Sequence, residues 1–509
     1  MRPPDAPDYR LGIVGAGALG QGIAQVAVTA GLDVSIVDSR PGLAETACRT
    51  VAGRFEALVE RGRMTVVEQA AALARLVPVA RLASLATSDA VIETLVEDRA
   101  VKRTVIAELE EIVAAGCLIA SATASVPVAA LAAGAQRPAR IAGMHFLAPV
   151  PVMRLVEIVR AVATDAETVS ALEVLARRLG REPVVVRDAP GFLVGLGGAA
   201  LVTEALRLQH DGVAAAPVID AIMRDAWGFS SGPFEMMDEG GLDRACLAVE
   251  RVWAAHQHDP RLAPRPGLRA LMEGGRLGRV TGRGWYAWED GGPSAVADPA
   301  LRPPGPAARA VAVMPGASEG LIGLCAVAGV AVTADDGACP VLAAPQAMDA
   351  SDTAYHGAST PAARRGLARR LVAVDLGPTA DGRVTLMTAP GADPACRDAV
   401  AAALSGAGRE VSAIADSVGF VGPRIAAMVV NLGCWMAETG LAAPGDVDRA
   451  MVLGLGYPRG PLALGEAMGP ARVLMLLEAL QRATGEDRYR PSEWLRRRAR
   501  LGLPLDTPA

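Results

Sequence analysis

The fold is decided by residues 11–38, which read L-G-I-V-G-A-G-A-L-G-Q-G-I-A-Q-V-A-V-T-A-G-L-D-V-S-I-V-D. An apolar run ends at Gly15, Gly17 and Gly20 complete a G-x-G-x-x-G pattern, and an apolar helical pattern follows. Gly15 permits a tight turn, Gly17 lets the backbone approach a pyrophosphate, and Gly20 lets the helix pack on the strand. The helix N-terminus offers free N–H groups and a partial positive charge to that phosphate. This order predicts dinucleotide binding more strongly than a structural glycine turn.

The second apolar run of this stretch ends in an acidic residue, Asp38. It lies about twenty residues beyond the glycines, where a carboxylate can bind the ribose hydroxyls. Such a carboxylate repels a 2′-phosphate, so the cofactor is predicted to be NAD rather than NADP. Arg40 is close enough in sequence to keep NADP open.

Composition excludes several classes of protein. A chain of 509 residues is too long for one core and predicts three or four domains. A net charge of −5 gives no basic face for nucleic acid. No apolar run reaches transmembrane length and the N-terminus lacks an apolar signal core, so a cytoplasmic protein without membrane contact is predicted. The seven cysteines form no C-x-x-C pair and the histidines lack neighbouring ligands, so no metal site is predicted.

The first part of the chain, up to about residue 185, alternates strand-like and helix-like segments, which predicts a doubly wound sheet. The strands are expected at Leu11–Gly15, Val34–Val37, Ala90–Glu93, Leu118–Ser121, Ile141–His145 and Leu155–Val159. After a Pro- and Gly-rich stretch the chain starts again, with strands expected at Ala310–Met314, Val341–Ala343, Leu371–Val374 and Val384–Thr388. The turn after the first of these reads P-G-A-S-E-G, so the phosphate loop is missing and no nucleotide is expected there.

A helical module occurs twice at a constant separation of 228 residues without a gap. The matched pairs include Gly191 with Gly419, Phe192 with Phe420, Gly212 with Gly440, Asp220 with Asp448, and the run from Trp227 with the run from Leu455. Such agreement indicates an internal repeat. The predicted class is therefore α/β plus all-α. Its parts are an N-terminal Rossmann doubly wound parallel sheet (1–190), a helical domain (191–289), a linker (290–309), a degenerate Rossmann-like domain (310–410) and a second helical domain (411–509).

Two residues in the first sheet domain could carry chemistry. His145 ends one predicted strand, and Glu157 lies on the next after a P-V-P link that can reverse the chain. A neutral imidazole can take a proton from an alcohol as hydride leaves the carbon, and a carboxylate on its other nitrogen fixes the tautomer. A lone histidine is more often structural, but ligands bind outside the carboxyl ends of the strands, where His145 lies.

The chain resembles the NAD-dependent 3-hydroxyacyl-CoA dehydrogenases over residues 10 to about 290. The matching stretches are G-A-G-A-L-G-Q-G-I-A-Q, the V-I-E-T around Glu93, G-M-H-F-L-A-P-V-P-V-M-R-L-V-E, P-G-F at Pro190–Phe192, G-P-F-E-M-M-D at Gly232–Asp238 and G-R-L-G-R-V-T-G-R-G-W-Y at Gly275–Tyr286. Its length and second helical domain look like the longer bacterial members, which include 3-hydroxybutyryl-CoA and 3-hydroxyadipyl-CoA dehydrogenases of fatty acid metabolism and aromatic catabolism.

The resemblance implies a role for each matching residue. His145 would be the general base and Glu157 would orient it. Gly15, Gly17, Gly20 and Asp38 would hold NAD, with Glu93 near the nicotinamide ribose. Hydride would pass between C3 of an L-3-hydroxyacyl thioester and NAD.

The chain departs from the family pattern at polar positions. The serine that normally touches the substrate falls on Ala124, and the two usual asparagines fall on Ala148 and Gly195. The lysine of the usual G-R-K-T-G motif falls on Val280. Ser125 could supply a hydroxyl to the substrate from the next position if the loop shifts.

These losses leave two alternatives beside an active dehydrogenase. One is a catalytically impaired homologue that binds NAD or an acyl thioester. The other is an enzyme for a different 3-hydroxy acid or a carrier-protein thioester. The acyl chain, the pathway and the oligomeric state are not fixed by the sequence. The two helical domains are expected to pack on each other as an internal pseudo-dimer, because a duplicated self-complementary surface can pair with its own copy.

Overall fold

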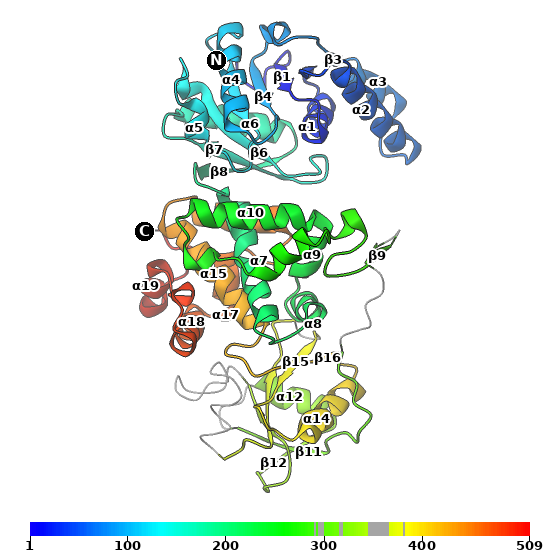
Figure 1. Cartoon of the computed structure of the whole chain (residues 1–509), viewed down its shortest axis with the longest axis vertical. Coiled ribbons are helices and arrows are strands. Elements are labelled where there is room, and N and C mark those ends of the chain that lie inside the picture. Colours follow the sequence, from blue (N-terminus) through cyan, green and yellow to red (C-terminus); the bar gives the residue numbers. More distant parts are fainter. Residues whose placement is uncertain (290–291, 294–299, 315–318, 345–365, 380–381, 509) are drawn as a thin grey trace. The chain divides into compact units, whose positions relative to one another are not determined.

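The structure, a computed structural model, describes residues 1–509 except 290–291, 294–299, 315–318, 345–365, 380–381 and 509 (Figure 1). The chain divides into two compact units. The first comprises residues 1–194 and 439–455, and the second comprises residues 195–438 and 456–509. Much of the predicted linker, and the turn that replaces the phosphate loop at 315–318, lie outside the described residues.

The first unit is built on an eight-stranded sheet in the order β3-β2-β1-β4-β5-β6-β7-β8. Its strands are β1 Arg10–Val14, β2 Asp33–Val37, β3 Leu76–Pro78, β4 Ala90–Glu93, β5 Leu118–Ser121, β6 Ile141–Phe146, β7 Leu155–Arg160 and β8 Glu182–Arg187. The predicted doubly wound sheet is confirmed, and β3 and β8 are additions to the predicted strands.

One pair of strands breaks the parallel pattern, since β6 and β7 run antiparallel. Residues 147–154 join them, and this link is too short to hold the crossover helix that a parallel pair requires. The antiparallel register places His145 directly opposite Glu157. The parallel arrangement returns between β7 and β8.

Helices cover both faces of this sheet. They are α1 Ala18–Thr29, α2 Leu43–Glu60, α3 Val66–Leu73, α4 Arg99–Ile112, α5 Val128–Ala132, α6 Ala166–Arg178 and α16 Pro444–Leu455, with short 3-10 turns at Leu82–Leu85 and Pro138–Arg140. The main core contains apolar side chains of α1, α2 and α6 packed on one sheet face. Val128 of α5 lies on the other face, close to Gly143 and Val159.

The second unit contains a six-stranded sheet in the order β12-β11-β13-β14-β15-β16. Its strands are β11 Ala310–Val313, β12 Ala331–Thr333, β13 Val341–Ala343, β14 Leu371–Asp375, β15 Val384–Met387 and β16 Val411–Ile414, with helices α12 Glu319–Val327 and α14 Pro394–Gly406. Here too one pair, β14 and β15, is antiparallel and is followed by a parallel pair. The second sheet therefore repeats the plan of the first with fewer strands.

The helical repeat predicted from sequence is visible in the order of elements. The first copy contains α7 Phe192–His210, α8 Ala216–Ala221, the π-helix η3 Ile222–Ala226, α9 Pro233–Gly240, α10 Leu242–Ala255, η4 Pro260–Leu262 and α11 Pro266–Glu273. The second contains α15 Gly422–Glu438, α16, α17 Pro461–Met468, α18 Pro470–Thr484, η7 Asp487–Tyr489 and α19 Glu493–Leu501. Even a strained residue recurs, since Phe192 and Phe420 have positive φ angles of 47° and 59°.

Helix α7 has a further property. Among the described residues it is the one helix long and apolar enough, by length and composition, to cross a membrane, and most of its apolar stretch is buried in the protein. Small elements complete the described chain at η5 Arg279–Thr281, β9 Trp288–Glu289 and β10 Gly292–Pro293.

The β14–β15 pair buries a carboxyl group. Asp375 is opposite Thr385 in the register and is 4% exposed. Its Oδ1 accepts the backbone N–H of Gly377 at 3.2 Å. Burial disfavours the charged form and raises the pKa of Asp375 to about 6.

This carboxyl group should make stability depend on pH. Between pH 4 and pH 6 the unfolded chain ionises Asp375 while the folded chain keeps it protonated, so stability falls as pH rises. The loss reaches about 3 kcal/mol above pH 6. Asp375→Asn should remove this dependence, and its thermal melting point relative to the parent should rise from pH 4 to pH 6 and then stay constant. Asp398→Asn, on α14, is the control. A constant difference between Asp375→Asn and the parent over this range would contradict the assignment.

Candidate active site

The glycine-rich loop connects β1 to α1 as the sequence predicts. Gly15 has φ +107°, and a Cβ there would lie 2.6 Å from Oγ1 of Thr94. A Cβ on Gly20 would overlap the carbonyl oxygen of Gly15. Around Gly17, by contrast, a Cβ would meet nothing within 4 Å. Two glycines are thus required by the turn, and the third leaves open space at the N-terminus of α1, where a pyrophosphate fits.

Asp38 closes this loop from the end of β2. Its Oδ2 accepts the N–H of Ala16 at 2.9 Å, and its Oδ1 accepts the N–H of Arg40 at 3.0 Å. Burial opposes ionisation of Asp38, but these hydrogen bonds and the Arg40 guanidinium lower the pKa of the carboxyl below its usual value. The side chain of Asp38 is therefore a carboxylate beside the loop, as ribose binding requires.

His145 and Glu157 form a hydrogen-bonded pair on the antiparallel strands. Nδ1 of His145 lies 2.6 Å from Oε2 of Glu157. The other oxygen, Oε1, accepts the N–H groups of Leu193 at 2.7 Å and Val194 at 3.2 Å. These are free N–H groups at the start of α7, where a negative charge is stabilised. The Glu157 side chain is fully buried and that of His145 is 12% exposed.

The turn before α7 contributes Phe192, a residue that the sequence analysis matched to the repeat and to the family but did not place at the site. The ring of Phe192 packs against the His145 imidazole with 5.6 Å between centroids. Gly191 and Phe192 both have positive φ angles, 82° and 47°. A positive φ strains a bulky residue, and such strain persists only where the surroundings impose it. The signal in the sequence was the P-G-F at residues 190–192.

Glu93 ends β4 and is fully buried. Both of its carboxylate oxygens lie 3.1 Å from Nζ of Lys102, which also donates to the carbonyl of Leu95 at 3.2 Å. Ser121 donates a short hydrogen bond to the same carboxylate. Lys102, the only lysine of the chain, is itself buried. The buried charge of Glu93 therefore has a buried partner of opposite charge. Contact of Glu93 with a cofactor stays a prediction.

The loop after β5 holds the residues expected near the substrate. Glu97 accepts the N–H of Ala124 at 2.5 Å and the hydroxyl of Thr123 at 2.9 Å, a role that the sequence did not indicate. Ser125 is half-buried and donates its backbone N–H to Thr123. Ala148, which replaces one usual asparagine, is exposed. Gly195 lies in the second unit, where a Cβ would meet only Val252 at 3.9 Å.

The second sheet carries different residues at the matching positions. Asp375 and Thr385 face each other on its antiparallel pair, as His145 and Glu157 do on the first. Thr385 follows Glu157 by 228 residues, the separation of the helical repeat. Within the described residues, the second hairpin therefore has an aspartic acid opposite Thr385 where the first has the imidazole opposite Glu157, and a threonine where the first has the glutamate.

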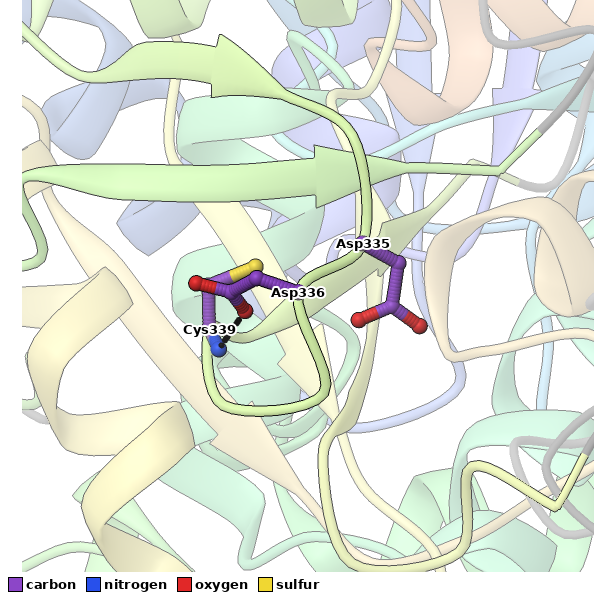
Figure 2. Close-up of side chains that lie close together, drawn as sticks. All are labelled: Asp335, Asp336 and Cys339. Atoms are coloured by element: carbon purple, nitrogen blue, oxygen red, sulfur yellow. Dashed lines mark hydrogen bonds between the residues drawn. The ribbon is translucent and has the colours of Figure 1, made fainter.

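A cluster of possible metal ligands lies elsewhere in the second unit, at Asp335, Asp336 and Cys339 (Figure 2). Asp336 accepts the N–H groups of Ala338 and Cys339, and these hydrogen bonds lower its pKa to about 2. Asp335 pairs with Arg370 at 2.7 Å. The carboxylate of Asp336 thus stabilises a turn, and that of Asp335 forms an ion pair.

Comparison with known proteins gives matches to both sheet and helical parts of the chain. Residues 10–189 match the family described as 3-hydroxyacyl-CoA dehydrogenase, NAD binding domain. Residues 191–288 and 419–505 both match 3-hydroxyacyl-CoA dehydrogenase, C-terminal domain, which confirms the helical repeat. The chain is 34% identical to 3-hydroxyadipyl-CoA dehydrogenase of Escherichia coli over 96% of this chain and 97% of that one. It is 36% identical to 3-hydroxybutyryl-CoA dehydrogenase of Bradyrhizobium diazoefficiens, over 56% of this chain and 97% of that one.

Solved structures agree. The crystal structure of 3-hydroxybutyryl-CoA dehydrogenase from Escherichia coli has a TM-score of 0.85 at 33% identity, covering 97% of this chain and 99% of that chain. The (S)-3-hydroxybutyryl-CoA dehydrogenase of Ralstonia eutropha gives 0.54 at 35% identity, covering 56% of this chain and all of that one. The chain belongs to the 3-hydroxyacyl-CoA dehydrogenase family and carries its NAD-binding domain.

Proposed function

We propose that this NAD-dependent dehydrogenase oxidises the C3 hydroxyl of an L-3-hydroxyacyl-CoA with His145 as the general base. The observation that carries the proposal is the contact of 2.6 Å between Nδ1 of His145 and Glu157. With Nδ1 held by a carboxylate, Nε2 is the nitrogen left to accept the hydroxyl proton. NAD, when bound, supplies the acceptor for the hydride that leaves C3. In the reverse direction His145 returns the proton to the C3 oxygen.

Glu157 acts on the histidine rather than on the substrate. Two N–H groups at the start of α7 fix one oxygen, which leaves the other directed at Nδ1. This arrangement holds the tautomer and stabilises the imidazolium that forms when the proton is taken.

His145→Ala should abolish turnover and leave NAD affinity nearly unchanged, because the base acts on the alcohol proton. Glu157→Gln should lose roughly a hundredfold or more in kcat, since tautomer control is lost. The assay follows NADH absorbance with acetoacetyl-CoA, and calorimetry follows NAD. Comparable activity of His145→Ala would refute the role of the histidine. An inactive parent that still binds NAD would favour a catalytically impaired homologue instead.

We propose that NAD binds only to the first sheet, held by Gly15, Gly17, Gly20 and Asp38. The open space at Gly17 and the carboxylate state of Asp38 support this choice. Glu93 and Ser125 are proposed neighbours of the nicotinamide ribose and the substrate.

The cofactor assignment predicts one NAD site per chain and a preference that depends on the charge of residue 38. Asp38→Asn should weaken NAD binding by about tenfold or more, the usual worth of a hydrogen bond to a charged group. The substitution should also reduce the ratio of NAD affinity to NADP affinity. Asp33→Asn, at the other end of β2, is the matched control. Two equivalent sites, or an unchanged preference in Asp38→Asn, would contradict the assignment.

The identity of the acyl group is a finer proposal. The relatives are named for 3-hydroxyadipyl-CoA and 3-hydroxybutyryl-CoA, so both thioesters are candidates for this chain. The loss of polar residues at Ala124, Ala148 and Gly195 keeps a different 3-hydroxy acid or a carrier-protein thioester as the alternative. A cytoplasmic location and a part in fatty acid or aromatic catabolism stay predictions, as do the domain limits 1–190, 191–289, 290–309, 310–410 and 411–509.

We further propose that the two helical copies form an internal pseudo-dimer. Glu204 of α7 is fully buried, and its carboxylate contacts Arg424 of α15 at 2.6 Å and Arg488 of η7 at 2.8 Å. Tyr489 donates to Glu204 at 2.9 Å, and Arg207 pairs with Glu486. A fully buried carboxylate with two partners from the other copy supports an interface that stays closed.

Removing the second half should expose this interface. A fragment of residues 1–289 would leave Glu204 and the apolar face of α7 without partners, so light scattering should show dimers or aggregates. A soluble, active monomer would count against the pseudo-dimer.

A further inference from the structure

Helix α16 belongs to the second helical copy by sequence, yet it packs in the first unit. It contacts β7 and β8 of the first sheet. The carbonyl of Leu441, just before the helix, accepts the N–H of Arg187 at the end of β8 at 2.8 Å. A helix from the C-terminal half thus lies on the sheet that carries His145.

The face that α16 covers follows from the alternation of side chains along β7. Val156 and Ile158 point into the core formed with α1, α2 and α6. Leu155 and Glu157 must then point to the opposite face. A Cβ on Gly454, in the last turn of α16, would contact Leu155, so α16 lies on the face of Glu157.

Gly454 sits against the surroundings of the His145–Glu157 pair. A Cβ there would lie 2.9 Å from Leu155 Cδ2, 2.9 Å from Val194 Cγ2 and 3.1 Å from Leu147 Cδ1. Leu155 and Leu147 lie two residues from Glu157 and His145 respectively, and Val194 donates its N–H to Glu157. Glycine inside a helix costs about 1 kcal/mol relative to alanine. Its presence at this point of α16 fits a close approach that a side chain would prevent.

A similar close approach occurs in the second unit, but there the glycines lie on the hairpin connection and the alanine lies on the helix. Ala226, 228 residues before Gly454, ends η3. It packs against glycines of the β14–β15 connection, since a Cβ on Gly377 would lie 2.6 Å from the Ala226 carbonyl. In each case a helical segment packs on the antiparallel hairpin that precedes the other helical copy: α16 packs on the β6–β7 hairpin, and η3 packs on the β14–β15 hairpin.

Resting on the proposed function, we propose that α16 is a positioning element of the catalytic site. It covers the face of β7 that holds Glu157 and packs on Val194, so it excludes water from the carboxylate and fixes the N–H donors that hold it. Hydrogen bonds strengthen when water is excluded. The C-terminal half is then required for the geometry of His145, although its described hairpin carries Asp375 and Thr385 in place of a histidine and a glutamate.

Gly454→Ala tests this proposal, with Gly445→Ala as the matched control. Both glycines lie in α16, neither has a positive φ, and a Cβ on Gly445 would meet nothing within 4 Å. In Gly454→Ala the side chains beside the pair must shift by a few tenths of an ångström. The expected result is a loss of roughly tenfold in kcat with acetoacetyl-CoA and NADH, since small misplacements of catalytic groups are costly. KM, NAD affinity and melting temperature should change little, and Gly445→Ala should behave as the parent.

A second readout does not depend on turnover. In [15N]histidine-labelled protein only five histidines contribute, and the His145 signal is identified by its loss in His145→Ala. The Nδ1–H resonance of His145 should move in Gly454→Ala and stay in place in Gly445→Ala. Adding Leu155→Val to Gly454→Ala removes one of the two contacts of 2.9 Å and should restore part of both kcat and the resonance position.

The outcomes separate the two proposals. An unmoved resonance and parental kcat in Gly454→Ala, while His145→Ala is inactive, would overturn the role of α16 and leave the dehydrogenase mechanism intact. A moved resonance in a protein without dehydrogenase activity would support α16 and overturn the proposed function. A fall in melting temperature with an unmoved resonance would assign Gly454 to stability alone and also overturn the proposal.

Discussion

The contact between His145 and Glu157 depends on one reversal in an otherwise parallel sheet. Strands β6 and β7 are joined by a link too short for a crossover, so they pair antiparallel and bring the imidazole opposite the carboxylate. The start of α7 then binds the second oxygen of Glu157 through two N–H groups. The loop at Gly191, the strained Phe192 and the packing of α16 are arranged around this pair.

Much of this site could be predicted because it is local in sequence. The glycines of residues 15–20, the acid at 38 and the histidine with its glutamate each lie at strand ends, and strand ends of one sheet share an edge. Contacts made by residues outside the strand ends could not be predicted from the strand pattern. Lys102 reaches Glu93 from a helix, and α16 reaches the sheet from some 290 residues further along the chain than Glu157. Short strands such as β3 and β12 carry too few residues for a recognisable period.

Duplication explains why the second half keeps the fold but not the chemistry. Its antiparallel hairpin remains, with Asp375 and Thr385 facing each other, and burial keeps that aspartic acid protonated up to about pH 6. Both helical copies match the same family domain, and the positive φ of Phe192 recurs at Phe420. With α16 as a positioning element, the second half supports the site of the first.

The most direct measurement is a crystal structure of the full chain with NAD and acetoacetyl-CoA. We expect NAD on the Gly15–Gly20 loop alone, and the C3 oxygen of the thioester within hydrogen-bond distance of Nε2 of His145. A C3 oxygen distant from His145, or a nucleotide on the second sheet, would contradict the proposed mechanism.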